Sequence, residues 1–276
     1  MEARMTQDTR HLTDNVCRLC GGAVDSLFKK KVLGKYIVSY CKCSHCYSLQ
    51  TEKPYWLDEA YKKNLSIMDT GAAQRNLHNL AACYIITKLL KARNVIDIGG
   101  GDGLLCRLLR DYEINCYVKD KYATSSYGQG FTEENFNAPD LILGFEVLEH
   151  YPNPVSDLDD LFNYKPHALL LSTAIFTNEK QDWWYLAPES GQHIFFYSKK
   201  ALNMIAAKYK YELVVSGGFI LFVKNPTLIT KIASKILLKG LVVRLLKSLI
   251  FFLPTRGVWQ DHLLQVEKSK QDQQEL

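Results

Sequence analysis

The chain has 276 residues, of which 47% are hydrophobic, and its formal net charge is +5. A chain of this length and composition buries a full hydrophobic core and leaves room for a small accessory module. The modest charge does not by itself indicate a nucleic-acid partner. Residues 1–15 are polar and of mixed charge, and they lack the apolar core of a signal peptide. We therefore expect a flexible leader and a cytoplasmic protein.

Four cysteines near the N-terminus form two pairs, Cys17-x-x-Cys20 and Cys43-x-x-Cys46. Two such pairs have the spacing of a structural zinc site with four thiolate ligands. The alternatives are reduced structural cysteines and disulfides, which the cytosol disfavours. The stretch between the pairs is basic, aromatic and rich in β-formers, which is typical of a hairpin. We predict a zinc-ribbon lobe over residues 16–50, with these four cysteines bound to Zn²⁺.

The predicted hairpin turns at Gly34 and carries a group of lysines. A zinc ribbon with a basic face often suggests nucleic-acid binding. We favour a solvated surface on an accessory lobe and expect no nucleic-acid partner, because enzyme-like features continue downstream without a break. Cys41 and His45 lie in the second cysteine knuckle and are alternative zinc ligands. The lysines are Lys29, Lys30, Lys31, Lys35 and Lys42.

The stretch N-V-I-D-I-G-G-G-D-G, residues 94–103, organises the rest of the chain. Its apolar first half predicts a strand buried on both faces, with Asp97 near the carboxyl end. The glycines that follow let the backbone turn sharply and approach a ligand closely, where a Cβ would clash. Leucines at helical spacing come next, so the turn opens a helix whose first amides point at the ligand. The glycines are Gly99, Gly100, Gly101 and Gly103.

A second acidic residue strengthens this interpretation, because glycine-rich turns also connect strands to helices without any ligand. Asp120 ends an apolar run at residues 114–118, about twenty residues after the glycines, where a carboxylate can accept hydrogen bonds from ribose hydroxyls. The loop contains no lysine followed by Ser or Thr, which disfavours a triphosphate-binding P-loop. A dinucleotide and S-adenosylmethionine remain as candidate ligands.

Two motifs in this part of the chain resemble those of class I S-adenosylmethionine-dependent methyltransferases. D-I-G-G-G-D-G is similar to motif I, acidic-x-G-x-G-x-G, with Asp97 as the acidic residue. Residues 140–150, D-L-I-L-G-F-E-V-L-E-H, are similar to the fourth strand and its E-V-x-E-H continuation. The resemblance implies an α/β fold, a Rossmann-like doubly wound sheet with a closing antiparallel hairpin, that binds S-adenosylmethionine.

The resemblance also implies which residues hold the cofactor. Arg75, at the start of a predicted helix over residues 72–91, could pair with the carboxylate of the cofactor's methionine, although a surface arginine fits equally well. The segment 122–137 shows little strand or helix pattern where the superfamily has both, and Phe131 is the candidate for stacking on the adenine. The cofactor-binding candidates are Arg75, Asp97, Gly99, Gly100, Gly101, Asp120, Phe131, Phe145 and Glu146.

The segment 173–198, after a predicted strand at 168–172, carries the information about the acceptor. It contains D-W-W-Y-L and P-E-S-G-Q-H-I-F-F-Y-S, and in a doubly wound sheet it emerges at the carboxyl edge. Its aromatic and polar groups suit a carbohydrate stacked on tryptophan, although tandem tryptophans can equally be core. The G-Q-H-x-x-F pattern, coupled to a four-cysteine module, resembles methyltransferases of glycan and deoxysugar biosynthesis. This implies a sugar or glycan acceptor.

The leading hypothesis is therefore methyl transfer to a sugar or glycan hydroxyl. A hydroxyl is a poor nucleophile unless its proton leaves as the methyl group arrives, and histidine is the best base near neutral pH. His193 is the first choice and His150 the second; the alternative for His193 is a structural histidine that fixes the loop. Two other functions stay open: methylation of another small acceptor, and a non-enzymatic zinc-ribbon module that binds nucleic acid on a decayed fold.

Residues 51–225 are predicted to form the methyltransferase domain. After a predicted helix at 199–209, two β runs at 211–215 and 219–223 are joined through Gly217-Gly218. This arrangement fits the closing hairpin of the sheet.

Residues 226–276 differ in composition from the rest of the chain. The segment 228–253 is strongly apolar, but lysines and an arginine interrupt it, so a spanning helix is not expected. Gly240 divides it into two predicted helices. These could lie on an anionic membrane surface as a peripheral contact, or pack on the domain or a second subunit, and we favour packing. The tail after Gln265 is predicted to be disordered, and the sequence does not predict the oligomeric state.

Overall fold

The computed structural model describes residues 16–61, 69–132 and 138–274, so the predicted leader at 1–15 lies outside the described residues. The chain divides into two compact units, each assembled from segments that are distant in sequence. Among the described residues, the first unit comprises 16–61, 146–163 and 172–213, and the second comprises 69–132, 138–145, 164–171 and 214–274. The predicted boundary at residue 50 therefore lies inside a compact unit.

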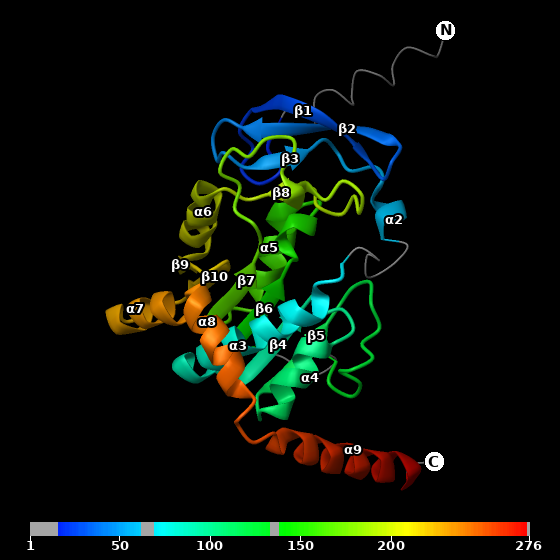
Figure 1. Cartoon of the computed structure of the whole chain (residues 1–276), viewed down its shortest axis with the longest axis vertical. Coiled ribbons are helices and arrows are strands. Elements are labelled where there is room, and N and C mark those ends of the chain that lie inside the picture. Colours follow the sequence, from blue (N-terminus) through cyan, green and yellow to red (C-terminus); the bar gives the residue numbers. More distant parts are fainter. Residues whose placement is uncertain (1–15, 62–68, 133–137, 275–276) are drawn as a thin grey trace. The chain divides into compact units, whose positions relative to one another are not determined.

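A six-stranded sheet runs through the second unit (Figure 1). β4 is parallel to both of its neighbours, β5 and β6. Gly217 and Gly218, both with positive φ, form the turn between β9 and β10, which confirms the closing hairpin. The predicted Rossmann-like sheet is confirmed. Its strands, in spatial order, are β5 (Asn115–Lys119), β4 (Asn94–Ile98), β6 (Leu141–Phe145), β7 (Ala168–Ser172), β10 (Phe219–Val223) and β9 (Glu212–Ser216).

The segment between β5 and β6 is reduced, as its sequence predicts. Residues 120–132 form neither a helix nor a named strand, and Thr132 makes only an isolated parallel bridge to Val118. Among the residues described here, the third strand-and-helix unit is therefore replaced by a loop. That loop packs back on the glycine-rich turn, since the Tyr127 amide donates to the Asp102 carbonyl at 2.8 Å.

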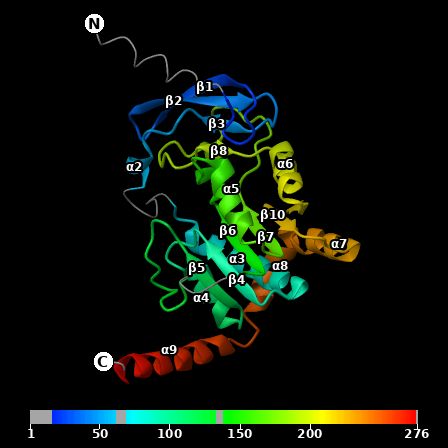
Figure 2. The same ribbon diagram turned by 180° about the vertical axis from the view of Figure 1, so that it is seen from behind.

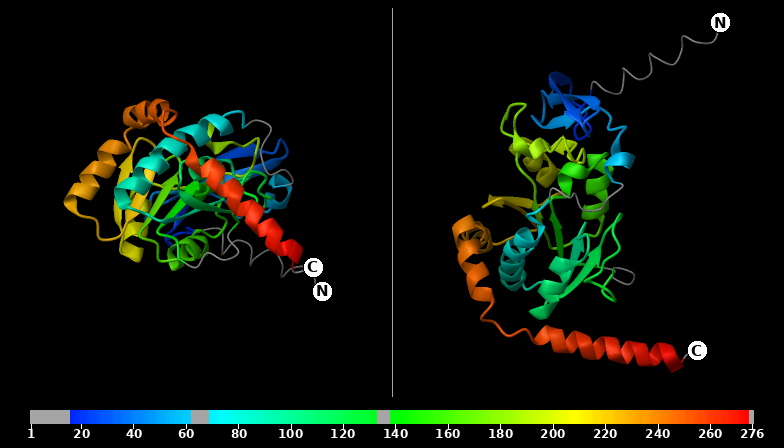
Figure 3. Two further views of the ribbon diagram at one scale, coloured as in Figure 1. Left: turned by 90° about the horizontal axis from the view of Figure 1, so that it is seen from below. Right: turned by 45° about the vertical axis from the view of Figure 1, so that its right-hand side comes forward.

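Helices of the second unit cover the sheet and bury its core. The predicted helix at 72–91 is confirmed, and it packs against α4, α7 and α8 (Figure 3). The core includes Leu80 and Ile86 from α3, and Leu109 from α4. In the described part of the chain, no helix is both long and apolar enough to cross a membrane. The helices are α3 (Ala72–Leu90), α4 (Leu104–Asp111), α7 (Leu228–Leu237), α8 (Gly240–Ile250) and α9 (Arg256–Gln274).

The prediction of a disordered tail after Gln265 is wrong, because helix α9 continues to Gln274. Two physical causes explain the difference. The tail lacks Gly and Pro and is rich in Gln, Glu and Lys, which favour helices. The first half of α9 is also anchored: Asp261 accepts hydrogen bonds from Arg107 and Arg110 of α4, both at 2.7 Å. The division of 228–253 near Gly240 into two helices is confirmed.

The first unit contains a four-stranded antiparallel sheet in the order β1-β2-β3-β8 (Figure 2). The predicted hairpin with its turn at Gly34 is confirmed as β1 and β2. The last strand, β8, comes from the segment 173–198 and pairs with β3, with Leu49 opposite Phe196. The N-terminal module and the predicted acceptor segment therefore share one sheet. The strands are β1 (Val24–Val32), β2 (Tyr36–Cys43), β3 (Leu49–Thr51) and β8 (Phe195–Phe196).

Short helices complete the first unit around a second core. That core holds Tyr40, Trp56 and Phe196, all of which are buried. The predicted cap at Ser198 is confirmed, since its hydroxyl accepts a hydrogen bond from the Ala201 amide at 3.0 Å. The helices are α2 (Leu57–Ala60), η2 (Leu148–His150), α5 (Pro154–Asn163), η3 (Trp184–Leu186) and α6 (Lys199–Tyr209).

Candidate active site and metal centre

The glycine-rich turn between β4 and α4 has a backbone that requires glycine. Gly99, Gly101 and Gly103 have φ angles of 69°, 55° and 78°, in the left-handed region. A Cβ on Gly100 would lie 2.5 Å from Oδ2 of Asp97, which is too close for any side chain. A Cβ on Gly101 would meet no atom within 4 Å, so space is open beside the backbone at this residue. The turn therefore has the form of a cradle for a ligand.

Asp120 holds this turn in place from the end of β5. One carboxylate oxygen accepts the Gly101 amide at 2.9 Å, and the other accepts the amides of Tyr122 and Ala123 at 2.7 and 2.8 Å. The predicted acidic residue is therefore beside the glycines. Its carboxylate organises the turn and the loop that follows β5.

Asp97 lies beneath the turn with one carboxylate oxygen unused. The residue is 2% exposed, and its Oδ2 has no hydrogen-bond partner. Burial, with a smaller contribution from the charge of Asp120, raises the pKa of Asp97 to about 7. A buried carboxylate oxygen without a partner fits a cationic ligand group, and S-adenosylmethionine brings both an ammonium and a sulfonium. The donor set thus fits the predicted cofactor.

Three other cofactor candidates have different surroundings. The Arg75 guanidinium is paired with Asp69, with Nη1 at 2.8 Å from Oδ1, so its contact with a methionine carboxylate stays a prediction. Phe131 is buried, and the Arg110 guanidinium lies 3.5 Å from its ring centroid, so that face is not open to an adenine. The predicted stacking role of Phe131 does not fit this geometry. Phe145 is partly buried and packs edge-on against Phe219.

Glu146 and Glu149 meet at one tyrosine in the first unit. The Tyr185 hydroxyl lies 2.9 Å from Oε2 of Glu146 and 2.6 Å from Oε1 of Glu149. The Ser172 hydroxyl donates to the other oxygen of Glu146 at 2.7 Å. Glu146 has a φ of 56°, a strained value for a residue with a side chain, and such strain concentrates at functional sites.

The tyrosine has one proton for two carboxylates, so one carboxyl must carry a proton of its own. Glu149 is the candidate, because it is fully buried and its Oε2 has no hydrogen-bond partner. Burial and the charge of Glu146 raise the pKa of Glu149 to about 8. At neutral pH, Glu149 can therefore donate to the Tyr185 oxygen, while the Tyr185 hydroxyl donates to Glu146.

The two predicted histidines lie beside this pair of carboxyl groups. His193 Nδ1 is 2.7 Å from the Tyr185 carbonyl oxygen, which only accepts, so Nδ1 carries the proton and Nε2 is the basic nitrogen. His150 Nδ1 contacts the Tyr61 hydroxyl at 2.9 Å. Burial, and then the charge of His193, lower the pKa of His150 to about 3, so it is neutral. The two Nε2 atoms lie 3.9 and 4.0 Å from Oε1 of Glu149, an arrangement that could hold a metal ion.

A family model described as "Methyltransferase domain" matches residues 65–216, more than half of the chain. The chain belongs to this methyltransferase family. It is a class I, S-adenosylmethionine-dependent methyltransferase, as the motif at Asp97 implies. Among curated proteins, a search found no match to the sequence.

Solved structures similar to this methyltransferase are themselves described as methyltransferases. The methyltransferase domain of bacterial-CtHen1-C is 16% identical, with 55% of this chain and 99% of that chain covered and a TM-score of 0.38. Magnesium protoporphyrin IX methyltransferase from Synechocystis PCC 6803, with bound SAH, is 13% identical over 63% and 98%, with a TM-score of 0.41. Human N-acetylserotonin methyltransferase, in complex with SAM, is 12% identical over 63% and 67%, with a TM-score of 0.40.

The N-terminal module of the methyltransferase holds the loop that carries His193. The Ile194 carbonyl accepts hydrogen bonds from the Thr51 amide at 3.0 Å and from the Arg18 guanidinium at 2.6 Å. The Trp56 indole donates to the Gly191 carbonyl at 2.8 Å. The position of His193 is therefore built by residues that precede it by more than a hundred positions.

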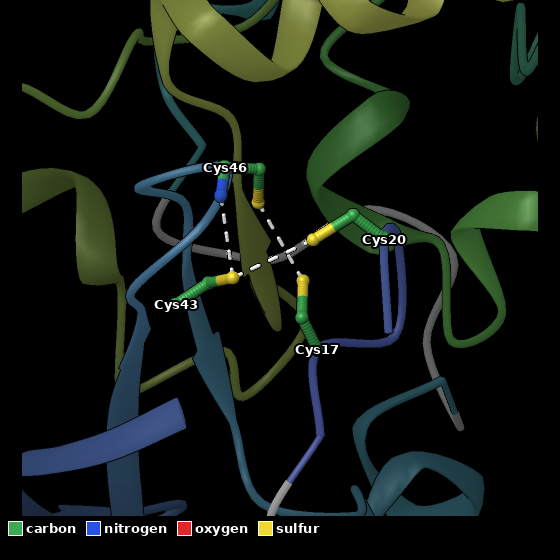
Figure 4. Close-up of side chains that lie close together, drawn as sticks. All are labelled: Cys17, Cys20, Cys43 and Cys46. Atoms are coloured by element: carbon green, nitrogen blue, oxygen red, sulfur yellow. Dashed lines mark hydrogen bonds between the residues drawn. The ribbon is translucent and has the colours of Figure 1, made fainter. Parts of the chain in front are cut away.

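The four predicted zinc ligands come together at the tip of this module (Figure 4). The Sγ atoms of Cys17 and Cys46 lie 3.6 Å apart, and those of Cys20 and Cys43 lie 3.5 Å apart. Zn–S bonds of about 2.3 Å in a tetrahedron place sulfurs about 3.8 Å apart, whereas a disulfide needs about 2.0 Å. All four are free thiols, so the group has the geometry of a metal site. The positive φ of Gly21, 70°, allows the first knuckle.

The two alternative zinc ligands do not join this group of cysteines. Among the described residues, Cys41 and His45 do not belong to the group of ligand atoms that lie close together at the four cysteines.

Lysines of the predicted basic face make contacts within the chain. Lys35 is paired with Glu59 at 2.7 Å, and the Lys30 ammonium donates to the Gln181 carbonyl, also at 2.7 Å. Both lysines therefore contact other residues of the same unit, and the solvated surface without a nucleic-acid partner stays a prediction.

The two tandem tryptophans have different surroundings. The sequence alone could not show which of them is packed and which is exposed. Trp183 is partly buried and packs against the core of the first unit, with ring contacts to Phe176, Tyr185 and Phe196. Trp184 is 79% exposed and touches Tyr185 only with an edge-on ring contact at 5.3 Å. Tyr185 is the member of the candidate site that sequence reasoning missed. The D-W-W-Y-L run drew attention to the position, but nothing local indicated that its hydroxyl joins two carboxyl groups.

Proposed function

We propose that this methyltransferase transfers the methyl group of S-adenosylmethionine to a hydroxyl of a sugar or glycan, with His193 as general base. The observation that carries the proposal is the fixed tautomer of His193. Because Nδ1 is bound to the Tyr185 carbonyl, the basic Nε2 is turned toward the buried carboxyl group of Glu149.

The chemistry needs one proton to leave the acceptor. S-adenosylmethionine supplies the methyl group from a sulfonium. As the new O–C bond forms and the S–C bond breaks, the hydroxyl proton passes to Nε2 of His193. Glu146, held by the hydroxyls of Ser172 and Tyr185, can accept a hydrogen bond from a neighbouring hydroxyl of the acceptor. Sugars commonly carry two neighbouring hydroxyl groups. One of them could give its proton to His193 while the other donates a hydrogen bond to Glu146.

The exposed indole of Trp184 supports a carbohydrate rather than another small acceptor. Sugar rings present C–H faces that stack on aromatic rings, and Trp184 offers such a ring next to Tyr185. His150 is neutral and bound to Tyr61, so we assign it to positioning within the same group rather than to proton transfer.

We also propose that Cys17, Cys20, Cys43 and Cys46 bind a structural Zn²⁺. The ion would close the two knuckles and hold the strand that pairs with β8, so that its effect reaches the His193 loop. The cysteines leave no open coordination position, which fits a structural site rather than a catalytic one.

Transfer of a labelled methyl group to a panel of acceptors tests the function. Nucleotide sugars and free oligosaccharides should be labelled, and phenols and carboxylic acids should not. Labelling of phenols alone would support the other small-acceptor hypothesis. Tight, salt-sensitive binding of nucleic acid without affinity for S-adenosylmethionine would support the non-enzymatic one.

A crystal structure with S-adenosylhomocysteine tests the base directly. His193 Nε2 should line the space beside the sulfur, and a distant position would exclude it as the base. Titration with Mg²⁺ or Mn²⁺ separates a base from a metal ligand, because a base at His193 predicts methyl transfer that is unchanged by either ion.

A further inference from the structure

Helices α7 and α8 are apolar on more than one face, which is unusual for helices at a protein surface. One face of α8 is packed, since Val243 and Ile250 are buried in the core. α8 lies along α3, where the Lys247 ammonium donates to the side-chain oxygen of Gln74 at 2.9 Å (Figure 3). A helix that carries apolar residues on several faces is normally buried by other protein elements or by a membrane. The opposite face therefore needs an explanation.

That opposite face exposes large apolar side chains in regular rows. Leu241, Leu245 and Leu249 follow at intervals of four, so they form one stripe along α8, and Leu241 is 80% exposed. Phe252, just beyond the helix, is 86% exposed. Of the 23 exposed large hydrophobic residues in the described chain, ten lie between residues 228 and 253. They are Leu228, Ile229, Ile232, Ile236, Leu241, Leu245, Leu249, Phe251, Phe252 and Leu253.

The charges of the same segment decide which partner fits. Residues 228–253 contain five cations and no Asp or Glu. Two copies of this face would bring like charges together without an acid in the segment to neutralise them, which is unfavourable. An anionic lipid surface offers apolar depth and negative charge at once. The cations are Lys231, Lys235, Lys239, Arg244 and Lys247.

We propose that α7, α8 and residues 251–253 bind the surface of an anionic membrane. The apolar rows enter the boundary between headgroups and acyl chains, and the lysine stems carry their charges back to the lipid phosphates. The favoured packing on the domain agrees with the face that lies on α3, and the proposal concerns the exposed face, which is left for lipid. The inference goes beyond methyl transfer and does not depend on the nature of the acceptor.

Co-sedimentation of the full chain with vesicles tests the proposal. We expect binding to phosphatidylcholine vesicles that contain phosphatidylglycerol, release of the protein at high salt, and little binding to phosphatidylcholine alone. The variant with Leu241→Ser, Leu245→Ser and Leu249→Ser should bind at least about tenfold more weakly. Lys235→Gln with Lys239→Gln should weaken binding about 25-fold.

A matched control uses exposed apolar residues outside the segment. Leu27→Ser with Ile37→Ser, in the β1–β2 hairpin, should leave vesicle binding unchanged. Equal thermal unfolding and S-adenosylmethionine affinity would show that the leucine variant is folded, and this separates loss of lipid binding from loss of the enzyme. Absence of binding to anionic vesicles, or binding that the leucine variant retains, would overturn the proposal. A dimer by light scattering that the leucine variant loses would overturn it in favour of a second copy.

Discussion

The proposed donor site at the glycine-rich turn and the proposed acceptor-side group around Tyr185 are built in opposite ways. The donor site comes from one short stretch, in which Asp97, the glycine-rich turn and Asp120 follow one another along the chain. The acceptor-side group brings Tyr61, Glu146 and His193 together from segments that are far apart, and the N-terminal module holds the loop that carries the histidine. A local site depends on few residues, whereas an assembled site is sensitive to changes at a distance from the chemistry. Five predictions test this difference.

The largest effect should follow from removing both acids of the donor site. Asp97→Ala with Asp120→Ala should abolish S-adenosylmethionine binding in calorimetry, because the first removes the buried carboxylate and the second releases the Gly101 amide. Asp140→Ala is the matched control, since Asp140 also binds backbone amides at the sheet, those of Arg93 and Asn94, but not the turn. Unchanged affinity in the double variant would contradict the donor site.

The second prediction concerns a change at His193 that should affect methyl transfer but not cofactor binding. His193→Asn should lower kcat by about 10²- to 10⁴-fold, because general-base catalysis contributes that much, and should leave cofactor affinity unchanged. His167→Asn, at an exposed histidine before β7, serves as the control. A purely structural histidine would instead lower the midpoint of thermal unfolding without a specific loss of kcat.

Loss of the four-cysteine site should act on the acceptor side only. Cys20→Ser should lower zinc content, measured by atomic absorption, and reduce methyl transfer by as much as ~100-fold, because small displacements of catalytic groups are this costly. The affinity for S-adenosylmethionine should not change, since the donor turn makes its contacts within the second unit. Cys41→Ser is the control. An equal loss of cofactor binding would show that the two sites are not separable.

The fourth prediction concerns pH at the donor site. The pKa of Asp97 is raised to about 7, so its charge is present above this pH and lost below it. A cationic ligand prefers the ionised form, and affinity for S-adenosylmethionine should therefore fall by up to about tenfold per pH unit below pH 7. Asp97→Asn, which cannot ionise, should bind weakly and with a flat pH profile. The affinity should be measured from about pH 6 to about pH 8, roughly one unit either side of the pKa of Asp97. A wild-type affinity that stays constant over this range would contradict this role.

The smallest effect should distinguish the two tryptophans. Trp184→Ala should raise KM for a sugar acceptor by about two- to tenfold with little change in kcat, the range expected for one stacking contact. Trp183→Ala should instead destabilise the first unit by about 3 kcal/mol, the lower end of the range for a large aromatic side chain, because Trp183 is partly buried and packs against the core. Thermal unfolding and steady-state kinetics on both variants measure the difference. The opposite pattern would place the sugar on Trp183.

The sequence predicted the parts of the fold whose signals are local. The strand Ala168–Ser172 and the helix Lys199–Tyr209 were placed to the residue, since hydrophobic periodicity and a serine cap identify them. The glycine-rich turn and the four cysteines also came together as expected. What escaped prediction depends on contacts between distant segments: the Tyr185 hydroxyl between two carboxyl groups, and the ion pairs that anchor α9 through Asp261.

The pairing of β3 with β8 also has a consequence for how the chain is made. Leu49 faces Phe196, so about 150 residues are synthesised between the two partners, and such non-local pairing slows folding. The cysteine knuckles are close together in sequence, so the proposed metal site can form soon after they leave the ribosome. The open edge of β3 must then wait, exposed to pairing with other chains, until the segment that completes it emerges. We expect this interval to be the stage of biosynthesis at which the nascent chain most needs a chaperone.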